Sequence, residues 1–186
     1  MLRFVFLYFS DIWLYNNYGD YLLKKFISIF FIPVCFFSLF INSSNTVNEY
    51  CFPCDTKIIT SKYGYRDLLG STNFHNGTDF GASRGSKIYA ISSGTITHVG
   101  FLNGYGNSVI ISHQNGYKSL YGHMDETYNV SIGDYVSKGY LIGYVGPKYL
   151  SNGKLNGFTT GPHLHLTVFD KNSNTINPES LNLKNK

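Results

Sequence analysis

Residues 109–121 read VIISHQNGYKSLY, and this stretch gives the clearest indication of the fold. Two short runs rich in β-branched and aromatic residues flank the dipeptide Asn115-Gly116. Both residues of this dipeptide tolerate the positive φ angles that a two-residue hairpin turn requires. The stretch therefore predicts two antiparallel strands, one on each side of a tight turn.

Short apolar segments of the same kind recur on both sides of this hairpin, bounded by Gly, Asn and Ser. Turn signals such as Ser93-Gly94 and Gly133-Asp134 separate them, and no segment has the spacing of a long amphipathic helix. The sequence therefore predicts an all-β domain, in which antiparallel sheets fold into a small sandwich or half-barrel with a groove. The expected strands are 87–91, 95–99, 108–112, 118–121, 140–145 and 163–169.

The composition agrees with one folded domain plus an appendage. The chain has 186 residues, 43% of them hydrophobic and only 14% charged, with 16 Tyr and 15 Phe. These proportions exclude a disordered chain and a charge-rich coiled coil. The net charge is +4, but the Lys and Arg residues are scattered and form no basic surface pattern. We therefore expect no nucleic-acid partner.

The N-terminal region contains an apolar run, residues 26–41, which reads FISIFFIPVCFFSLFI and follows Lys24-Lys25. This order of charge and apolar residues is typical of a secretory signal or of a membrane anchor. The run is short for a membrane-spanning helix and long for the core of a signal, and Pro33 would kink a helix. A cleaved signal and a retained anchor both stay open, and in either case the rest of the chain is expected outside the cytoplasm.

The chain is accordingly divided into four parts. Residues 1–45 form a leader, 46–56 a linker, 57–181 the folded domain and 182–186 a polar tail. The linker contains Cys51 and Cys54 with the spacing of a redox dithiol, but no helix follows them as such a motif requires. We therefore expect a local disulfide or two unpaired thiols there.

Two histidine motifs carry the clearest chemical signal. In His75-Asn-Gly-Thr-Asp79 the central residues disfavour a helix, so the motif predicts a loop leading into a strand, where both end residues can converge on one ion. His163 and His165 lie two apart in an apolar run and share one face of a strand. Two imidazoles and a carboxylate are a set that zinc takes while leaving a fourth position for water, which suits amide hydrolysis. The spacing leaves open which of these residues bind the metal.

Four blocks of the chain, in order, resemble the lysostaphin-type (LytM-like) family of zinc metallopeptidases, which cleave peptide cross-bridges of bacterial peptidoglycan. The resemblance covers about residues 57–180, and its blocks are Tyr63-Gly-Tyr-Arg66, His75-Asn-Gly-Thr-Asp79, Tyr121-Gly-His-Met124 and Thr160-Gly-Pro-His-Leu-His165. The resemblance implies that His75, Asp79 and His165 hold one Zn²⁺ ion. It also implies that His123 and His163 stand beside the bound water.

Proton transfer is expected to fall to His123 and His163, because the sequence offers no obvious Glu as a general base. The ordinary pKa of histidine suits proton transfer near neutral pH. We predict that the pair positions and deprotonates the water, stabilises the oxyanion and returns a proton to the leaving amine. Which histidine performs each step stays open.

Other polar residues carry weaker indications. Arg66 would support the site, contact substrate or have no role, and His98 and His113 are interpreted as structural. Lys138 lies in a pattern similar to the lysine turn of lipoyl-bearing domains, but we interpret it as an ordinary turn residue. The sequence assigns no substrate-binding residue.

The chain departs from the family pattern between Gly146 and Thr160, where the resemblance would give a very short turn. Residues 147–159 form a longer segment that holds Lys148, Tyr149, Lys154 and Asn156. We expect this loop to border the groove, where it would change cross-bridge preference or act as a lid.

The sequence therefore predicts a zinc-dependent endopeptidase that acts on peptidoglycan peptides in the cell envelope. The location would be periplasmic or otherwise extracytoplasmic, with the protein secreted or anchored in the inner membrane. Restraint of its activity would come from location, from the N-terminal region or from a protein regulator. The alternative is a catalytically silent module that binds the wall or activates another hydrolase; the presence of all five site residues favours catalysis.

Overall fold

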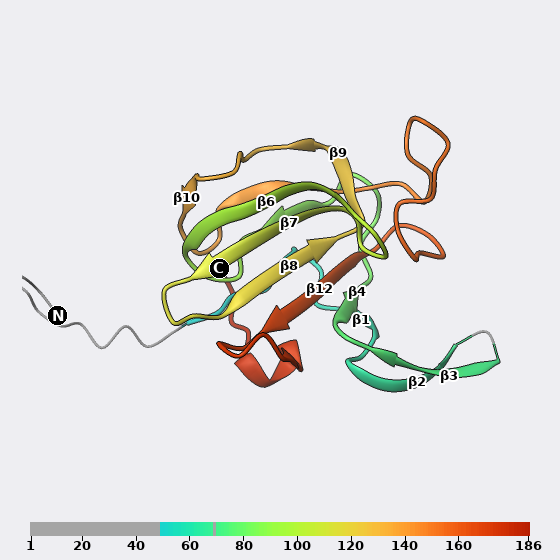
Figure 1. Cartoon of the computed structure of the whole chain (residues 1–186), viewed down its shortest axis with the longest axis horizontal. Coiled ribbons are helices and arrows are strands. Elements are labelled where there is room, and N and C mark those ends of the chain that lie inside the picture. Colours follow the sequence, from blue (N-terminus) through green and yellow to red (C-terminus); the bar gives the residue numbers. More distant parts are fainter. Residues whose placement is uncertain (1–48, 69) are drawn as a thin grey trace, which may run out of the picture. The chain divides into compact units, whose positions relative to one another are not determined.

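The computed structural model of the chain describes residues 49–68 and 70–186 (Figure 1). These residues form antiparallel β-sheets and one short 3-10 helix, η2 (Pro178–Leu181), with no α-helix among them. The prediction of an all-β domain is confirmed. The apolar run 26–41 lies outside the described residues. Within the described ranges, no helix has the length and apolar character needed to span a membrane.

The largest sheet has eight strands, all paired antiparallel. Strand β13 (Thr175–Ile176) pairs with β12 beside the main path. The order along that path is β1 (Ile59–Ser61), β4 (Thr78–Phe80), β12 (Leu164–Phe169), β8 (Lys118–Gly122), β7 (Gly106–His113), β6 (Gly94–Leu102) and β10 (Tyr135–Val136).

Strands β7 and β8 form the predicted hairpin, but its turn differs from the two-residue type. Only Gly116, at φ 82°, has a positive φ angle in the turn. The Gly116 N–H donates to the His113 carbonyl at 3.0 Å, and the Asn115 side chain accepts a hydrogen bond from the Tyr117 N–H at 3.1 Å. The loop is therefore of the longer kind that ends in a left-handed glycine.

Two smaller sheets complete the fold. The three-stranded sheet has the order β5 (Lys87–Tyr89), β11 (Leu141–Val145) and β9 (Met124–Tyr128), and the third sheet is the hairpin of β2 (Gly64–Leu68) and β3 (Ser71–His75). Buried side chains of the eight-stranded and three-stranded sheets, such as Leu166 and Ile142, belong to one hydrophobic core. Burial of this shared core stabilises the face-to-face arrangement of the two sheets.

Residues 50–54 belong to the folded domain, although the sequence suggested a linker there. Tyr50, Cys51 and Cys54 are buried, and the Cys51 N–H donates to the Ile91 carbonyl at 2.8 Å. The segment also pairs with the end of the chain, where the Lys184 N–H donates to the Tyr50 carbonyl at 2.9 Å. Apolar side chains at both ends explain this packing, because they add to the core.

Both cysteines of this segment are free thiols in the structure. The Cys51 thiol donates to the Ala90 carbonyl at 3.3 Å. Burial raises the pKa of Cys54 to about 12 and also raises that of Cys51. The thiols therefore stay protonated and unreactive at neutral pH, which argues against a redox role.

Candidate metal and catalytic site

The predicted metal ligands come from three strands of two different sheets. Asp79 on β4 lies opposite His165 on β12 in the register of the large sheet. His75 is the last residue of β3, and the chain returns through Gly77 into β4. A Cβ atom at Gly77 would lie 2.7 Å from the His165 ring, so only glycine permits this close approach. The fold thereby joins residues that are far apart in the sequence.

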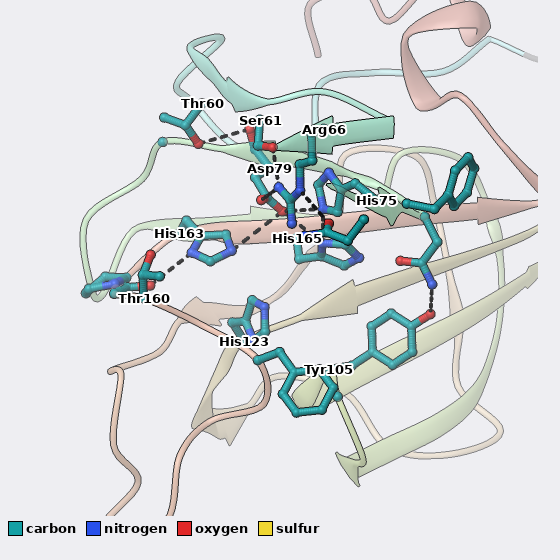
Figure 2. A pocket seen from close by; sticks show the side chains of 18 of the residues that line it. Thr60, Ser61, Arg66, His75, Asp79, Tyr105, His123, Thr160, His163 and His165 are labelled. Carbon is teal, nitrogen blue, oxygen red and sulfur yellow. Dashed lines mark hydrogen bonds and ion pairs between the residues drawn. The ribbon is translucent and has the colours of Figure 1, made fainter. Parts of the chain in front are cut away.

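The ligand atoms of these three residues converge closely (Figure 2). Asp79 Oδ1 lies 2.8 Å from His165 Nδ1 and 3.2 Å from His75 Nε2. The two ring nitrogens are 3.1 Å apart. All three side chains are buried and line one groove, so their ligand atoms are held close together.

Hydrogen bonds behind the ligands orient the two imidazole rings. The His75 Nδ1–H donates to the Lys62 carbonyl at 2.9 Å, which leaves its Nε2 unprotonated. His165 Nδ1 lies 2.8 Å from the Asp79 carboxylate, which can only accept, while the Thr167 hydroxyl, 2.9 Å from Nε2, can donate or accept. With a metal in place of the proton on Nδ1, Nε2 would carry the proton and donate it to Thr167. The His75 lone pair, His165 Nδ1 and a carboxylate oxygen therefore face one another. A cation that replaces the proton between them would find three converging ligand atoms, so the donor set fits a zinc ion.

Asp79 is ionised in this setting. Burial alone would raise its pKa, but the interactions with His163, His165 and His75 outweigh burial and hold the pKa well below its usual range. Its second oxygen, Oδ2, lies 3.3 Å from Arg66 Nη1, which also contacts the Ser61 hydroxyl. The carboxylate therefore supplies a full negative charge to the site.

His123 and His163 lie side by side next to the ligands, with ring centroids 4.7 Å apart. The His123 ring donates through Nδ1 to the Asn156 carbonyl at 2.6 Å, and the His163 ring donates through Nδ1 to the Gly161 carbonyl at 2.9 Å. His163 Nε2 lies 3.5 Å from Asp79 Oδ1. The Nε2 atom of His123 is thus left for chemistry, whereas the Nε2 atom of His163 faces Asp79.

The two histidines differ in their proton affinity. Burial, together with the charges of His163 and His165, lowers the pKa of His123 to about 3. Burial would also lower the pKa of His163, but its hydrogen bond to Asp79 and the charge of that residue raise it above the ordinary value. A pair of neighbouring titratable groups with opposite shifts is typical of general acid–base chemistry.

These residues lie in a groove of about 1100 Å³. In Figure 2 the histidines lie between Arg66 and Tyr105. Phe74 from β3 and Phe158 also line the groove and are 47% and 85% exposed. The groove is therefore open and partly aromatic, with room for an extended chain.

The structure places the sequence-derived candidates as follows. His75, Asp79, His123, His163 and His165 all come together in the groove. Arg66 contacts Asp79, which supports the first of its suggested roles. The residues interpreted as structural lie elsewhere, with His98 bonded to the Gly100 carbonyl and His113 to Ser93 and Ser119. Lys138 forms an ion pair with Glu49 at 2.8 Å.

The loop 147–159 borders the groove only at its end. Phe158 lines the groove, whereas Lys148, Tyr149 and Lys154 do not, and the orange segment after β11 extends away from the sheet in Figure 1. Asn156 is fully buried beneath the site. Sequence reasoning missed Tyr105, Phe158 and the buried role of Asn156, although the Gly-Tyr-Gly-Asn block around Tyr105 was a usable signal.

Comparison with known proteins finds a matching family model. The sequence model of Peptidase family M23 matches residues 73–178. The DD-carboxypeptidase/endopeptidase Mpg of Neisseria meningitidis serogroup B is 37% identical over 127 residues, which are 67% of this chain and 27% of Mpg. The chain thus spans about a quarter of the length of this curated relative.

Two solved structures share the fold. The catalytic domain of the antimicrobial peptidase lysostaphin from Staphylococcus simulans has a TM-score of 0.57 at 33% identity, covering 67% of this chain and 92% of that domain. A zinc-containing peptidase from Vibrio cholerae has a TM-score of 0.59 at 29% identity, covering 69% of this chain and 39% of that protein. The match to the lysostaphin domain spans nearly all of that domain.

Proposed function

Because the chain belongs to Peptidase family M23, we propose that it is a zinc-dependent endopeptidase that hydrolyses peptide cross-bridges of bacterial peptidoglycan. The observation that carries this proposal is the convergence of a His-Asp-His cluster with two further histidines in one open groove. The similarity to lysostaphin and to the DD-carboxypeptidase/endopeptidase Mpg supports the substrate class.

His75 Nε2, Asp79 Oδ1 and His165 Nδ1 would hold the metal, because these atoms lie within 4.8 Å of one another. Zinc bound there would supply Lewis-acid activation of a water molecule and of the scissile carbonyl. The Lys62 carbonyl keeps the His75 ring in the ligating tautomer, and Thr167 can accept the hydrogen bond that His165 Nε2 would donate with a metal on Nδ1. Arg66 holds the other oxygen of Asp79.

His123 would take the proton from the attacking water. Its Nε2 carries a lone pair because Nδ1 donates to Asn156, and its low pKa keeps the ring neutral at physiological pH. His163 would serve as the proton donor, because its Nδ1 donates to the Gly161 carbonyl and its Nε2 faces Asp79 Oδ1, an acceptor, at 3.5 Å. A protonated His163 Nε2 can donate a hydrogen bond to the developing oxyanion and a proton to the leaving amine.

The groove suits a peptide with polar and apolar parts. Phe74 and Phe158 offer apolar contacts, while Arg66 places a positive charge in the groove. Peptidoglycan peptides carry carboxylates, which agree with this charge and with the net charge of +4. The cell envelope is the corresponding location, and the apolar run 26–41 would supply export or anchoring.

The test is the digestion of purified sacculi of several cross-bridge types by the full-length protein, with the released fragments identified by mass spectrometry. We expect zinc-dependent release of peptide-cleaved fragments, and none from His165→Ala or His123→Ala. A folded, zinc-loaded parent protein that binds sacculi but releases nothing would instead identify a wall-binding or hydrolase-activating module. The masses of the fragments name the bond that is cut.

A further inference from the structure

His123 has an unusual backbone conformation in the connection between β8 and β9. Its φ angle is 56°, in the left-handed region that non-glycine residues rarely adopt. Its N–H donates to the Tyr105 carbonyl at 2.7 Å, and its carbonyl accepts a hydrogen bond from the Gly146 N–H at 2.8 Å. Segments on both sides therefore hold this backbone in place, as such conformations require.

The orientation of the His123 ring depends on one further contact. Ring atom Nδ1 lies 2.6 Å from the backbone carbonyl oxygen of Asn156. A carbonyl can only accept a hydrogen bond, so the proton must be on Nδ1 and the lone pair on Nε2. The position of the Asn156 carbonyl thus sets both the direction and the tautomer of the ring.

The Asn156 side chain fixes the position of that carbonyl. It is fully buried and makes three hydrogen bonds. Its Oδ1 accepts from the Asn107 N–H of β7 at 2.8 Å. Its Nδ2 donates to the carbonyls of Met124 at 2.9 Å and Pro147 at 3.1 Å. Since Met124 directly follows His123, one amide ties the end of the loop 147–159 to the strand that leaves the histidine.

Two glycines pack closely against the Asn156 side-chain amide and restrict its position. A Cβ atom at Gly106 would lie 2.2 Å from Asn156 Oδ1, and Gly106 also has a positive φ of 69°. A Cβ atom at Gly146 would lie 2.7 Å from Asn156 Nδ2. Only glycine fits at these two positions, so the amide is held by close packing as well as by its hydrogen bonds.

We propose that Asn156 is a positioning residue, which holds His123 in the orientation and tautomer that present a free Nε2 to the groove. The proposal rests on the proposed function, in which that nitrogen accepts the proton of the attacking water. The loop 147–159 then acts on the reaction through its buried end and not as a lid over the groove.

The first test compares Asn156→Asp with the parent in the full-length protein. Aspartate has the same size but cannot donate, so the carbonyls of Met124 and Pro147 lose their partner and face a carboxylate. We expect kcat for fragment release from sacculi to fall about tenfold or more, because small displacements of a catalytic group are costly. The half-saturating amount of sacculi and the bound zinc should stay at parent values.

Ser151→Ala is the matched control on the same loop. It removes the hydrogen bond from the Ser151 hydroxyl to Glu126 and leaves the contacts of Asn156 intact. We expect this variant to keep the kcat of the parent. Asn156→Ser shortens the side chain and removes the hydrogen bonds of the amide without adding a charge, and it replaces the aspartate variant if that variant does not fold.

The second readout is the tautomer of His123, measured by ¹⁵N NMR of the imidazole rings and assigned by the signal that His123→Gln lacks. We expect Nδ1 protonation in the parent and a mixture of tautomers in the Asn156 variants. Nε2 protonation in the parent, unchanged kcat in the variants, or lost kcat with an unchanged ring spectrum would each overturn the proposal. A parent that cleaves no sacculi refutes the proposed function, while the tautomer still tests the positioning.

Discussion

Arg66 Nη1 lies 3.3 Å from Asp79 Oδ2, while the other oxygen of the same carboxylate faces the histidines of the site. The guanidinium therefore leaves only Oδ1 free for a metal. This division holds the carboxylate in one orientation, as partners behind a metal ligand commonly do. Arg66 is thus the residue most directly placed to tune the ligand set from outside it.

Replacing Arg66 with Gln should weaken zinc binding. Gln cannot supply the charge that stabilises the ionised carboxylate, and loss of such an outer partner typically lowers metal affinity about tenfold to a hundredfold. Competition with a chromophoric chelator measures the affinity directly. Arg84→Gln is the control, because Arg84 is 3.7 Å from Asp125 and outside the ligand cluster. Equal affinities of Arg66→Gln and parent would contradict the prediction.

Thr167→Val should also lower zinc affinity, by about tenfold, because it removes the acceptor that holds His165 Nε2–H. The two side chains have nearly the same shape, so the change is mainly the loss of one hydrogen bond. Thr78→Val is the matched control on the adjacent strand, since Thr78 Oγ1 is buried and has no hydrogen-bond partner among the described residues. That control should keep the affinity of the parent, and chelator competition on both variants separates the two cases.

His113 should contribute to the pH dependence of stability. It is buried between the Ser93 carbonyl and the Ser119 hydroxyl, and burial lowers its pKa below the ordinary value. The unfolded chain therefore binds a proton at a pH where the folded chain does not. Stability from the neutral ring is complete above the unfolded pKa of about 6.5 and falls as the pH decreases below it.

The measurement for His113 is denaturant unfolding of the parent and of His113→Gln between pH 5 and 8. The parent should lose up to about 1.4 kcal/mol more per pH unit than the variant on the acid side. The comparison of slopes removes the contribution of the site histidines, which both proteins share. Identical slopes would show that His113 takes up a proton equally well in the folded state.

Local sequence patterns were sufficient to predict the strands but not to predict which strands pair with each other. The hairpin at Asn115-Gly116 and the strand beginning near His163 were predictable because turn residues and alternation are local signals. The pairing of β4 with β12 was not predictable from the sequence, because long-range register depends on tertiary packing. This pairing brings Asp79 next to His165, which lies 86 positions further along the chain. The residue types in the sequence indicated a metal site. The resemblance to the lysostaphin-type family suggested which residues are the ligands, and the structure places those residues together.

Residues 50–54 and Asn156 also have roles that depend on tertiary contacts and could not be predicted from local sequence. Residues 50–54 lack strand-like alternation, yet they pack with the end of the chain, because a few apolar side chains complete the core. Asn156 reads in the sequence as an ordinary loop residue. Its role became visible only when β7, β9 and the loop 147–159 were placed around it.

Phe158→Ala should weaken substrate binding without slowing the chemical step. Phe158 is 85% exposed, lines the groove and has its N–H bound to the Gly104 carbonyl at 2.8 Å, so its ring is an apolar surface with a fixed backbone. An exposed ring adds little to folding, but it loses contact with water when a substrate covers it. The expected result is a rise of about threefold to tenfold in the half-saturating amount of sacculi, with kcat unchanged, as for loss of uniform binding. Phe101→Ala is the control, because Phe101 is 51% exposed but does not line the groove, and it should leave both parameters at parent values. A fall in kcat for Phe158→Ala would instead connect this residue to the positioning of His123, the proposed proton acceptor.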